Sequence, residues 1–207
     1  MERSELDRLL ETAVRLFAEL GYDGTTLQLV ADAAGLDVAA VREAVGDGKA
    51  ELYREVMRFA AEAEGRALES ALDALTLDLP GYLRVADAYL DFYTERTDLL
   101  ALWLHRWMGD AADVPGLEQY YTTPVALEFA AAVRPMIPPD LDPDHVIWTV
   151  VWCVFGFLEG GLVYSDGSIP PERLRGQGLG PRDAESVERF RAHLHAMLRR
   201  LLAPAPL

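Results

Sequence analysis

The fold is decided by residues 16–36, LFAELGYDGTTLQLVADAAGL, which read as a helix end, a tight turn, a short helix and a second tight turn. Apolar residues before this stretch recur at three- and four-residue steps over residues 6–20, as expected for an amphipathic helix. Residues 21–24 contain two glycines and end that helix. Thr25-Thr26 can cap the next helix because a threonine hydroxyl accepts from free backbone N–H groups, and Gly35 ends it. The stretch therefore predicts helix–turn–helix geometry.

Helical periodicity continues through most of the chain, and strand signals are nearly absent. Asp37 is expected to cap a third helix from Val38 to Val45, and a fourth runs from about Lys49 to Ala63 or beyond. Longer helices are expected at Gly81–Arg96, Asp98–Met108, Leu117–Val133, Pro143–Tyr164 and Arg182–Leu202, with the longest loop at Ser165–Pro181. The sequence thus predicts an all-α fold that begins with a helix-turn-helix three-helix domain.

Composition excludes several classes of protein. The chain has 207 residues, of which 51% are hydrophobic and 26% charged, so it has the material for a core and is not a disordered chain. One cysteine, Cys153, excludes an internal disulfide scaffold. The net charge of -15 predicts a surface that repels nucleic acid unless a local patch compensates. The longest apolar run, Val146–Leu158, is shorter than the ~20 residues that span a bilayer. No targeting segment is visible, and we expect a cytoplasmic protein without membrane contact.

Three stretches together resemble the TetR-like (TetR/AcrR) transcriptional regulators. They are Leu16–Thr26, Val30–Leu36 and Lys49–Leu52, within a resemblance that covers residues 6–56. The resemblance implies a helix-turn-helix DNA-binding domain at 1–50 and a helical effector-binding and dimerisation domain at 51–207. It also implies a homodimer that binds operator DNA with two reading helices about 34–36 Å apart, and a small effector that releases the DNA, as in a repressor.

The expected DNA-reading segment, Asp37–Val45, departs from the family pattern. Arg42 stands where a phosphate-binding tyrosine is usual, and Val38 and Ala40 replace polar residues. Residues 1–60 carry seven basic and twelve acidic side chains, a net charge of -5, although DNA binding draws heavily on neutralised phosphates. Two interpretations therefore stay open: a regulator with unusual DNA contacts, or a TetR-like fold that has lost DNA binding and binds a ligand or partner.

Residues expected at the DNA interface follow from this resemblance. Thr26 and Lys49 are expected to position the DNA backbone, and Arg42 to face the bases with Val38 and Ala39. An arginine at such a position can pair with guanine O6 and N7. The full set is Thr25, Thr26, Gln28, Val38, Ala39, Arg42 and Lys49.

Aromatic residues are concentrated in the C-terminal part, where they can enclose a small apolar or aromatic effector or simply fill the core. Glu159 interrupts an apolar helix and, if buried, is a candidate hook for a cationic or hydroxylated ligand. The candidate effector-binding residues pair an apolar body with a polar tip or lie beside a polar group: Trp103, His105, Trp107, Tyr121, Trp152 and Glu159.

The last two helices are expected to form the dimer interface. The penultimate helix is apolar nearly all round and must be covered on most sides, and two helices from each subunit would make a symmetric four-helix bundle. A buried pair within one chain is the alternative. The candidate interface residues are Trp148, Val151, Phe155, Phe190, Leu194 and Leu198.

Signals for catalysis or a metal are weak. His193 and His195 are two positions apart, so on a helix they point to different faces. Cys153 lies in an apolar helix, where a thiol is normally inert. The glycines at 176–180 follow no strand and read as a loop rather than a phosphate-binding motif. The sequence predicts a protein that is not an enzyme and that uses no metal or cofactor.

Overall fold

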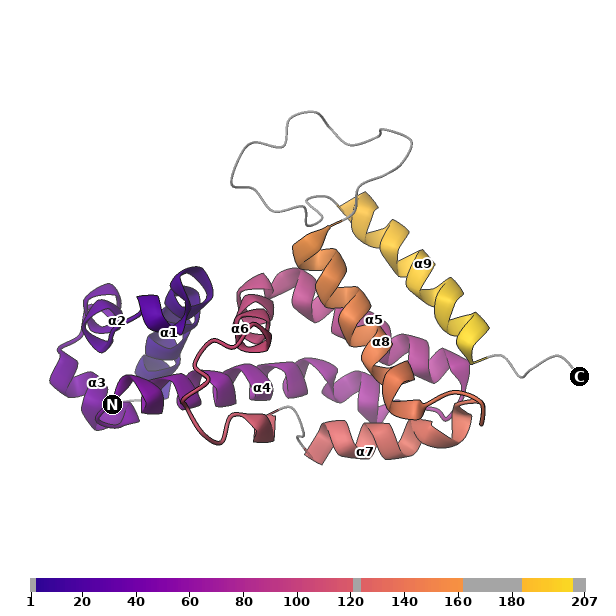
Figure 1. The fold of residues 1–207 in the computed structure, drawn as a ribbon, viewed down its shortest axis with the longest axis horizontal. Coiled ribbons are helices and arrows are strands. Elements are labelled where there is room, and N and C mark those ends of the chain that lie inside the picture. The colour runs from indigo at the N-terminus through magenta and orange to yellow at the C-terminus, as the bar shows by residue number, and fades with distance from the viewer. Residues whose placement is uncertain (1–2, 121–123, 162–183, 203–207) are drawn as a thin grey trace, which may run out of the picture. The chain divides into compact units, whose positions relative to one another are not determined.

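The computed structural model describes residues 3–120, 124–161 and 184–202, and its regular elements there are all helices (Figure 1). The all-α prediction is confirmed. No helix in these three ranges is long and apolar enough to cross a membrane. The α-helices are α1 (Arg3–Gly24), α2 (Leu27–Ala34), α3 (Val38–Val45), α4 (Lys49–Asp73), α5 (Leu79–Glu95), α6 (Thr97–Trp107), α7 (Pro124–Val133), α8 (Pro143–Phe155) and α9 (Ala184–Leu201). Shorter helical turns lie at Glu118–Tyr120, Arg134–Met136 and Gly156–Gly160.

The predicted caps of the two short helices are confirmed. The Thr26 hydroxyl accepts from the backbone N–H of Leu29 at 3.1 Å and begins α2. Gly35 ends α2 in the left-handed conformation, at φ 69°, which glycine adopts without steric cost. The Asp37 carboxylate accepts from the N–H of Ala39 at 2.7 Å and begins α3.

Two of the longer helices differ from the prediction. The single helix expected over Leu117–Val133 is wrong: a 3-10 turn occupies Glu118–Tyr120, and α7 begins only at Pro124. Proline lacks the N–H that continues a helix but fits its first turn, so Pro124 starts a new helix. The helix expected over Pro143–Tyr164 has α geometry only as far as Phe155.

The end of α8 is a π-helical turn, Gly156–Gly160, closed by Gly161 at φ 68°. Glycines lose more backbone freedom in a helix than other residues, so a glycine-rich end favours this departure from α geometry. The loop expected at Ser165–Pro181 and the helix start expected at Arg182 lie outside the described residues.

The chain divides into two compact units, which we name unit 1 and unit 2. Unit 1 comprises Met1–Arg66 and Arg96–Ala126, and unit 2 comprises Ala67–Glu95 and Leu127–Leu207. Helix α6 therefore packs with the helix-turn-helix segment although it lies more than 60 residues beyond α2 in the chain. A functional boundary after residue 50 stays a prediction.

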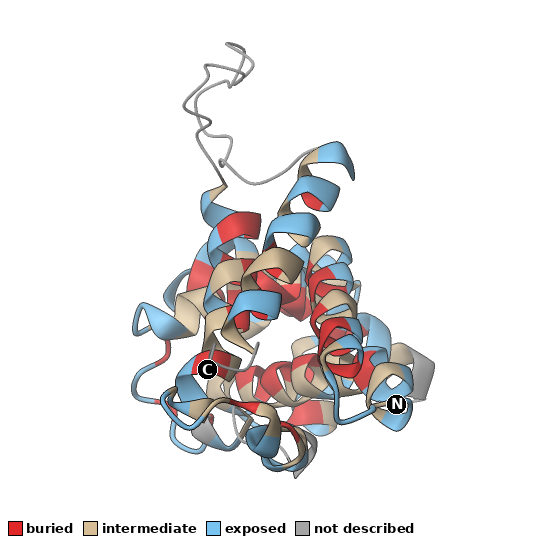
Figure 2. Cartoon of the chain, turned by 90° about the vertical axis from the view of Figure 1, so that its right-hand side faces the viewer, coloured by how far each residue is buried: buried red, intermediate tan, exposed pale blue. Residues whose placement is uncertain are grey.

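The core of unit 1 is built on the inner faces of α1 to α4. Leu9, Val30 and Val41 are fully buried, and they come from three successive helices. Tyr53 of α4 contacts the ring of Phe17 edge-on, with ring centres 4.9 Å apart. Figure 2 shows such buried positions as red stripes on helices whose other faces are exposed.

The core of unit 2 lies among α5, α8 and α9. Leu90, Val154 and Leu194 are fully buried, one on each of these helices. The Tyr93 ring packs edge-on against Phe155 with ring centres 4.9 Å apart. These apolar contacts fix α8 and α9 against α5 within the same chain.

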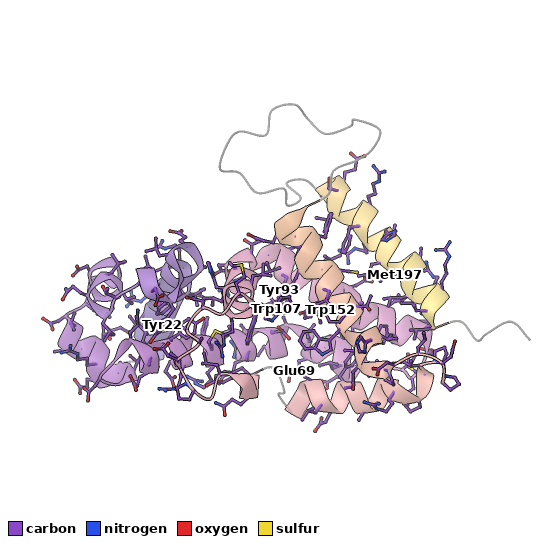
Figure 3. The ribbon with its side chains drawn as sticks, in the orientation of Figure 1. Tyr22, Glu69, Tyr93, Trp107, Trp152 and Met197 are labelled. Carbon is purple, nitrogen blue, oxygen red and sulfur yellow. The ribbon has the colours of Figure 1, made fainter. Side chains whose placement is uncertain are left out.

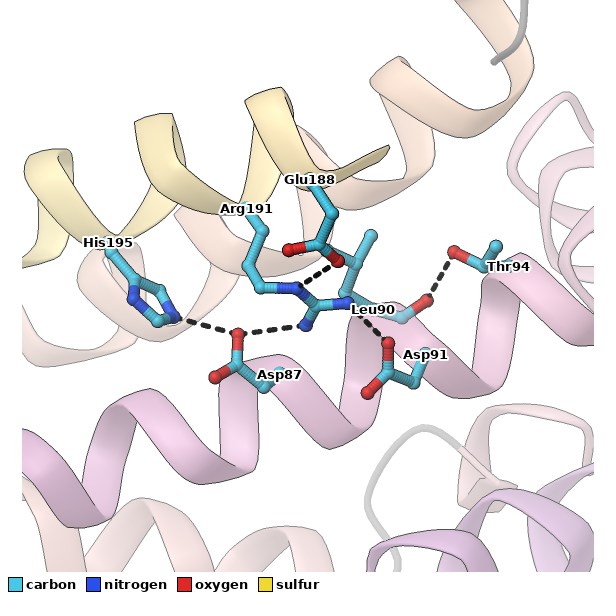
Figure 4. Close-up of polar contacts among 7 residues, drawn as sticks. All are labelled: Asp87, Leu90, Asp91, Thr94, Glu188, Arg191 and His195. Carbon is cyan, nitrogen blue, oxygen red and sulfur yellow. Dashed lines mark hydrogen bonds and ion pairs between the residues drawn. The ribbon is translucent and has the colours of Figure 1, made fainter. Parts of the chain in front are cut away.

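A cluster of charged side chains adds to the contact between α5 and α9 (Figure 4). Arg191 of α9 pairs with Asp87 at 3.0 Å, with Asp91, and with Glu188 at 3.0 Å. The Nε2 of His195 lies 2.8 Å from the same Asp87 carboxylate. Partial burial alone would lower the pKa of the Arg191 guanidinium, but hydrogen bonds to its three carboxylates outweigh this effect and raise the pKa.

We expect the Arg191→Ala variant to lose about 1.5–3 kcal/mol of unfolding free energy, the range for hydrogen bonds to charged groups. The Arg191 side chain is only 18% exposed, so lost packing of its stem also contributes. Urea denaturation measures the change, and the loss should shrink as salt is added. Arg199→Ala, which changes an exposed arginine of the same helix, is the control. Equal midpoints for the two variants would contradict a stabilising role for the cluster.

Candidate nucleic-acid interface

The outward face of α3 carries the residues that could read DNA. Val41 and Val45 are buried and hold the helix on the core of unit 1. Ala39 and Arg42 are exposed, and Val38 is half-buried. Of the three residues expected to face the bases, the structure therefore presents Ala39 and Arg42 fully and Val38 in part.

Arg42 is available to bind a ligand. Its side chain makes no hydrogen bond or ion pair with any residue that the structure describes, and it is the sole basic residue of α2 and α3. The α4 arginines are paired: Arg54 lies 3.3 Å from Glu51, and Arg58 bonds both Glu55 and Glu62. The positive charge that α2 and α3 can offer is thus that of one side chain.

Lys49 is engaged inside unit 1 rather than directed outward. Its ammonium donates to the carbonyl oxygen of Tyr22 at 2.7 Å and lies 4.0 Å from the centre of the Tyr22 ring. The expected phosphate contact at Lys49 would compete with both interactions. The structure therefore gives this residue a structural role at the start of α4.

Thr25 is also structural. Its side chain is fully buried, and its hydroxyl donates to the carbonyl oxygen of Gly21 at 2.8 Å, with the carbonyl of Leu16 at 3.2 Å. Thr26 and Gln28 are exposed, as a backbone contact requires. The Gln28 amide donates to Asp32 at 2.8 Å.

The turn before α2 begins with a break in α1. Gly21 has φ 71° and ψ 175°, outside helical values. In an unbroken helix, the carbonyl of Ala18 and the N–H of Tyr22 would pair with each other. Here each group has a partner from farther along the chain: Nε2 of His105 lies 3.0 Å from the Ala18 oxygen, and the Asp110 carboxylate accepts from the Tyr22 N–H at 2.7 Å.

We call His105 and Asp110 the α6 brace, because both belong to α6 or the turn that follows it. Arg106 supports this turn by donating to the Asp110 carbonyl oxygen at 3.1 Å. The same Tyr22 whose N–H binds the brace accepts from Lys49 through its carbonyl. A chain of hydrogen bonds therefore connects α6 to the end of α1 and the start of α4 within unit 1.

The candidate effector residues are distributed over both units. On α6, Trp103 is buried, His105 belongs to the α6 brace, and Trp107 is 39% exposed. On α8 and the following turn, Trp152 is 50% exposed and Glu159 is exposed. Figure 3 labels Trp107 and Trp152. Tyr121 lies outside the described residues. The shared effector site stays a prediction.

The candidate dimer residues fall into two groups. Phe155, Leu194 and Leu198 are buried within unit 2, so the structure assigns them to the core of a single chain. Their spacing indicates a buried helix face. A helix of a partner subunit and a neighbouring helix of the same chain can both cover such a face. Phe190 stacks on Phe157 of the same unit with ring centres 4.0 Å apart.

Trp148 and Val151, the other two candidates, remain half-exposed on α8. The exposed Trp152 lies beside Trp148, with ring centres 6.1 Å apart, and its edge meets the ring of His145 at 6.2 Å. This side of α8 therefore carries an aromatic surface that its own chain leaves open in part.

Comparison with protein families decides the identity of the helix-turn-helix segment. Residues 9–56, which contain the whole of α2 and α3, match the family model described as "Bacterial regulatory proteins, tetR family". This match covers less than a quarter of the chain and assigns the helix-turn-helix segment to the TetR type. No curated protein sequence matches it.

Solved structures share the fold over nearly the whole length of the chain. The ketosteroid transcriptional regulator KstR2 of Mycobacterium tuberculosis aligns with a TM-score of 0.68 and 16% identity, covering 98% of this chain and 97% of its own. AibR, solved with isovaleryl coenzyme A and operator DNA, aligns with a TM-score of 0.66 and 17% identity, covering 96% of this chain and 98% of its own. The TetR-family regulator PfmR of Thermus thermophilus aligns with a TM-score of 0.62 and 21% identity, covering 96% of this chain and 97% of its own.

The α6 brace is the part of unit 1 that the sequence did not predict. Gly21 was recognisable as a helix end, but its partners lie 87 and 88 residues from the groups they bind. The one local signal was Gly109 before Asp110, a pair typical of a turn. Its φ of 92° confirms the turn but says nothing of what the carboxylate binds.

We expect Asp110→Ala to lower the unfolding free energy of unit 1 by about 1–3 kcal/mol, because the Tyr22 N–H loses its acceptor. Asp110→Asn retains an acceptor oxygen and should recover most of the loss. Amide hydrogen exchange read at Tyr22 is the specific measurement, since its protection should fall in the alanine variant alone. If the asparagine variant exchanges as fast as the alanine variant, the negative charge and not the hydrogen bond matters.

Proposed function

We propose that this chain is a ligand-responsive transcriptional repressor that binds operator DNA as a homodimer through α3. The observation that carries the proposal is Arg42, exposed and unpaired among the described residues, on the outward face of a TetR-type helix-turn-helix. A helix of this size fits the major groove, where an arginine bonds guanine O6 and N7. Thr26 and Gln28 are exposed at the start of α2, which supports a contact of both with the DNA backbone.

The small number of available cations sets the character of this binding. Each neutralised phosphate makes affinity fall by about one decade per decade of salt. With Lys49 bound to Tyr22 and the α4 arginines Arg54 and Arg58 paired with carboxylates, few phosphate contacts remain. We therefore expect weak non-specific binding and a shallow salt dependence, with recognition carried by base contacts.

Effector control is supported by the hydrogen bonds that connect α6 to the end of α1 and the start of α4. AibR is a regulator of the same fold that was solved with both isovaleryl coenzyme A and operator DNA. In this chain, α6 carries the candidate effector residues Trp103 and Trp107 on either side of His105 in the sequence. A small apolar or aromatic effector that shifts α6 would disturb the α6 brace and favour a head geometry that does not fit DNA.

A homodimer would cover the aromatic surface of α8. Trp152 is one of the few large apolar side chains left exposed in the described residues, and Trp148 and Val151 lie on the same helix half-exposed. Gly156, also exposed, follows at the helix end and lets a partner backbone approach closely. A second copy of this chain, related by twofold symmetry, would place the same surface against itself.

We expect Arg42→Ala to lower affinity for the selected operator at least about tenfold, the lower range for a lost bidentate base contact. Fluorescence anisotropy at ~50 and ~200 mM salt measures it. Arg15→Ala, which removes an exposed arginine of α1, is the charge-matched control and should bind nearly as the parent does. Retained operator affinity in Arg42→Ala would overturn the assignment. Absence of any DNA binding by the parent at low salt would favour a ligand- or partner-binding protein.

We expect Trp152→Glu to convert the dimer to a monomer, because the substitution places two carboxylates in an apolar interface. Light scattering on a size-exclusion column at micromolar concentration gives the mass directly. Leu77→Glu changes another exposed apolar residue, 62% exposed and before α5, and should leave the dimer intact. A parent protein that is already monomeric would count against the interface.

A further inference from the structure

Helix α3 presents two opposite charges that do not neutralise each other. Arg42 and Glu43 are both exposed, and neither has an ion-pair partner among the described residues. Successive residues of an α-helix point about 100° apart, so neighbours in sequence do not face each other. Both charges are therefore available to a molecule that lies along this face.

Small side chains flank the two charges. Ala39 lies three and four positions before them on the same face, and Ala40 lies three positions before Glu43, both exposed. Methyl groups at these positions leave the charged side chains room to extend and can contact a thymine methyl group. The outward face thus consists of one cation, one anion and two methyl groups.

A carboxylate in the groove of DNA needs a hydrogen-bond donor, because phosphates repel it and it has no proton to donate. The major groove offers two such donors, the N4 amino group of cytosine and the N6 amino group of adenine. Adenine places the N7 acceptor beside its amino group, which repels a carboxylate, whereas cytosine presents the donor alone. Glu43 therefore suits cytosine, as Arg42 suits guanine.

The spacing of the two residues agrees with that of the bases. Consecutive Cα atoms are about 3.8 Å apart, close to the rise of about 3.4 Å between bases of one strand. Side chains at 42 and 43 can consequently reach neighbouring base pairs.

We propose that Glu43 is a specificity-determining residue that selects a cytosine amino group in the base pair next to that of the guanine bound by Arg42. The inference rests on the proposed function, because it requires α3 in the major groove. Glu43 changes the general affinity for DNA in the opposite direction to Arg42. Glu43 lowers affinity for DNA in general through phosphate repulsion, and it raises discrimination for a site that offers the cytosine donor.

The test is selection of sites from a pool of randomised duplexes by the full-length parent and by Glu43→Gln, Glu43→Ala and Asp47→Asn. The parent should enrich a site with neighbouring guanine and cytosine. Glu43→Gln should exchange the cytosine for adenine, since glutamine bonds adenine N6 and N7. Glu43→Ala should lose the preference at that position and bind unrelated duplex several-fold more tightly at ~50 mM salt.

Asp47→Asn is the matched control, because Asp47 is an exposed acidic residue just beyond α3. It should share the gain in general affinity but keep the cytosine preference. Thermal melting confirms folding of each variant, and the exposed position of Glu43 makes a folding defect unexpected. If the Glu43 variants enrich the parent site unchanged, Glu43 reads no base although DNA binding stands. If the parent enriches no site at all, the proposed function itself fails.

Discussion

The break in α1 at Gly21 is the constraint on which unit 1 depends. A residue with a Cβ would be strained at φ 71°, and its Cβ would lie 3.6 Å from the Asp110 carboxylate. The break turns the chain toward α2 and offers the Ala18 oxygen and the Tyr22 N–H to partners outside the helix. Because His105 and Asp110 bind these two groups, the local bend also fixes where α6 lies within the unit.

Tyr22 joins the remaining parts of the head to this bend. Its ring meets Tyr53 of α4 edge-on at 5.1 Å, and its carbonyl accepts from Lys49. Burial, with the negative charge of Asp113 adding to it, raises the pKa of the Tyr22 hydroxyl, so the ring stays neutral in the packed head. In the proposed function, the use of Lys49 in this network would leave recognition of DNA to the charges of α3. Such an arrangement would give unit 1 rigidity at the expense of phosphate contacts and would favour selectivity over general affinity.

The sequence predicted features that short segments determine, but it does not specify which distant residues meet. The cap at Thr26 and the helix end at Gly35 depend on groups within a few residues, so their patterns are readable. The buried state of Leu194 and Leu198 depends on α5, about 100 residues earlier, and an apolar stripe does not say which helix covers it. His105 was predicted to bind an effector because a polar aromatic near tryptophans suggests a pocket. Its partner, the Ala18 carbonyl, exists as a free acceptor only because of the break at Gly21.

The energies involved make the α6 brace suitable for control by an effector. Allosteric coupling between two sites is typically about 1–3 kcal/mol, and leaving one buried donor without its acceptor costs about the same. An effector that moved α6 far enough to part Asp110 from the Tyr22 N–H would therefore supply the whole coupling free energy through a single bond. Because the coupling between two binding sites is reciprocal, operator DNA that holds unit 1 with the α6 brace intact would lower the affinity for the effector by the same factor.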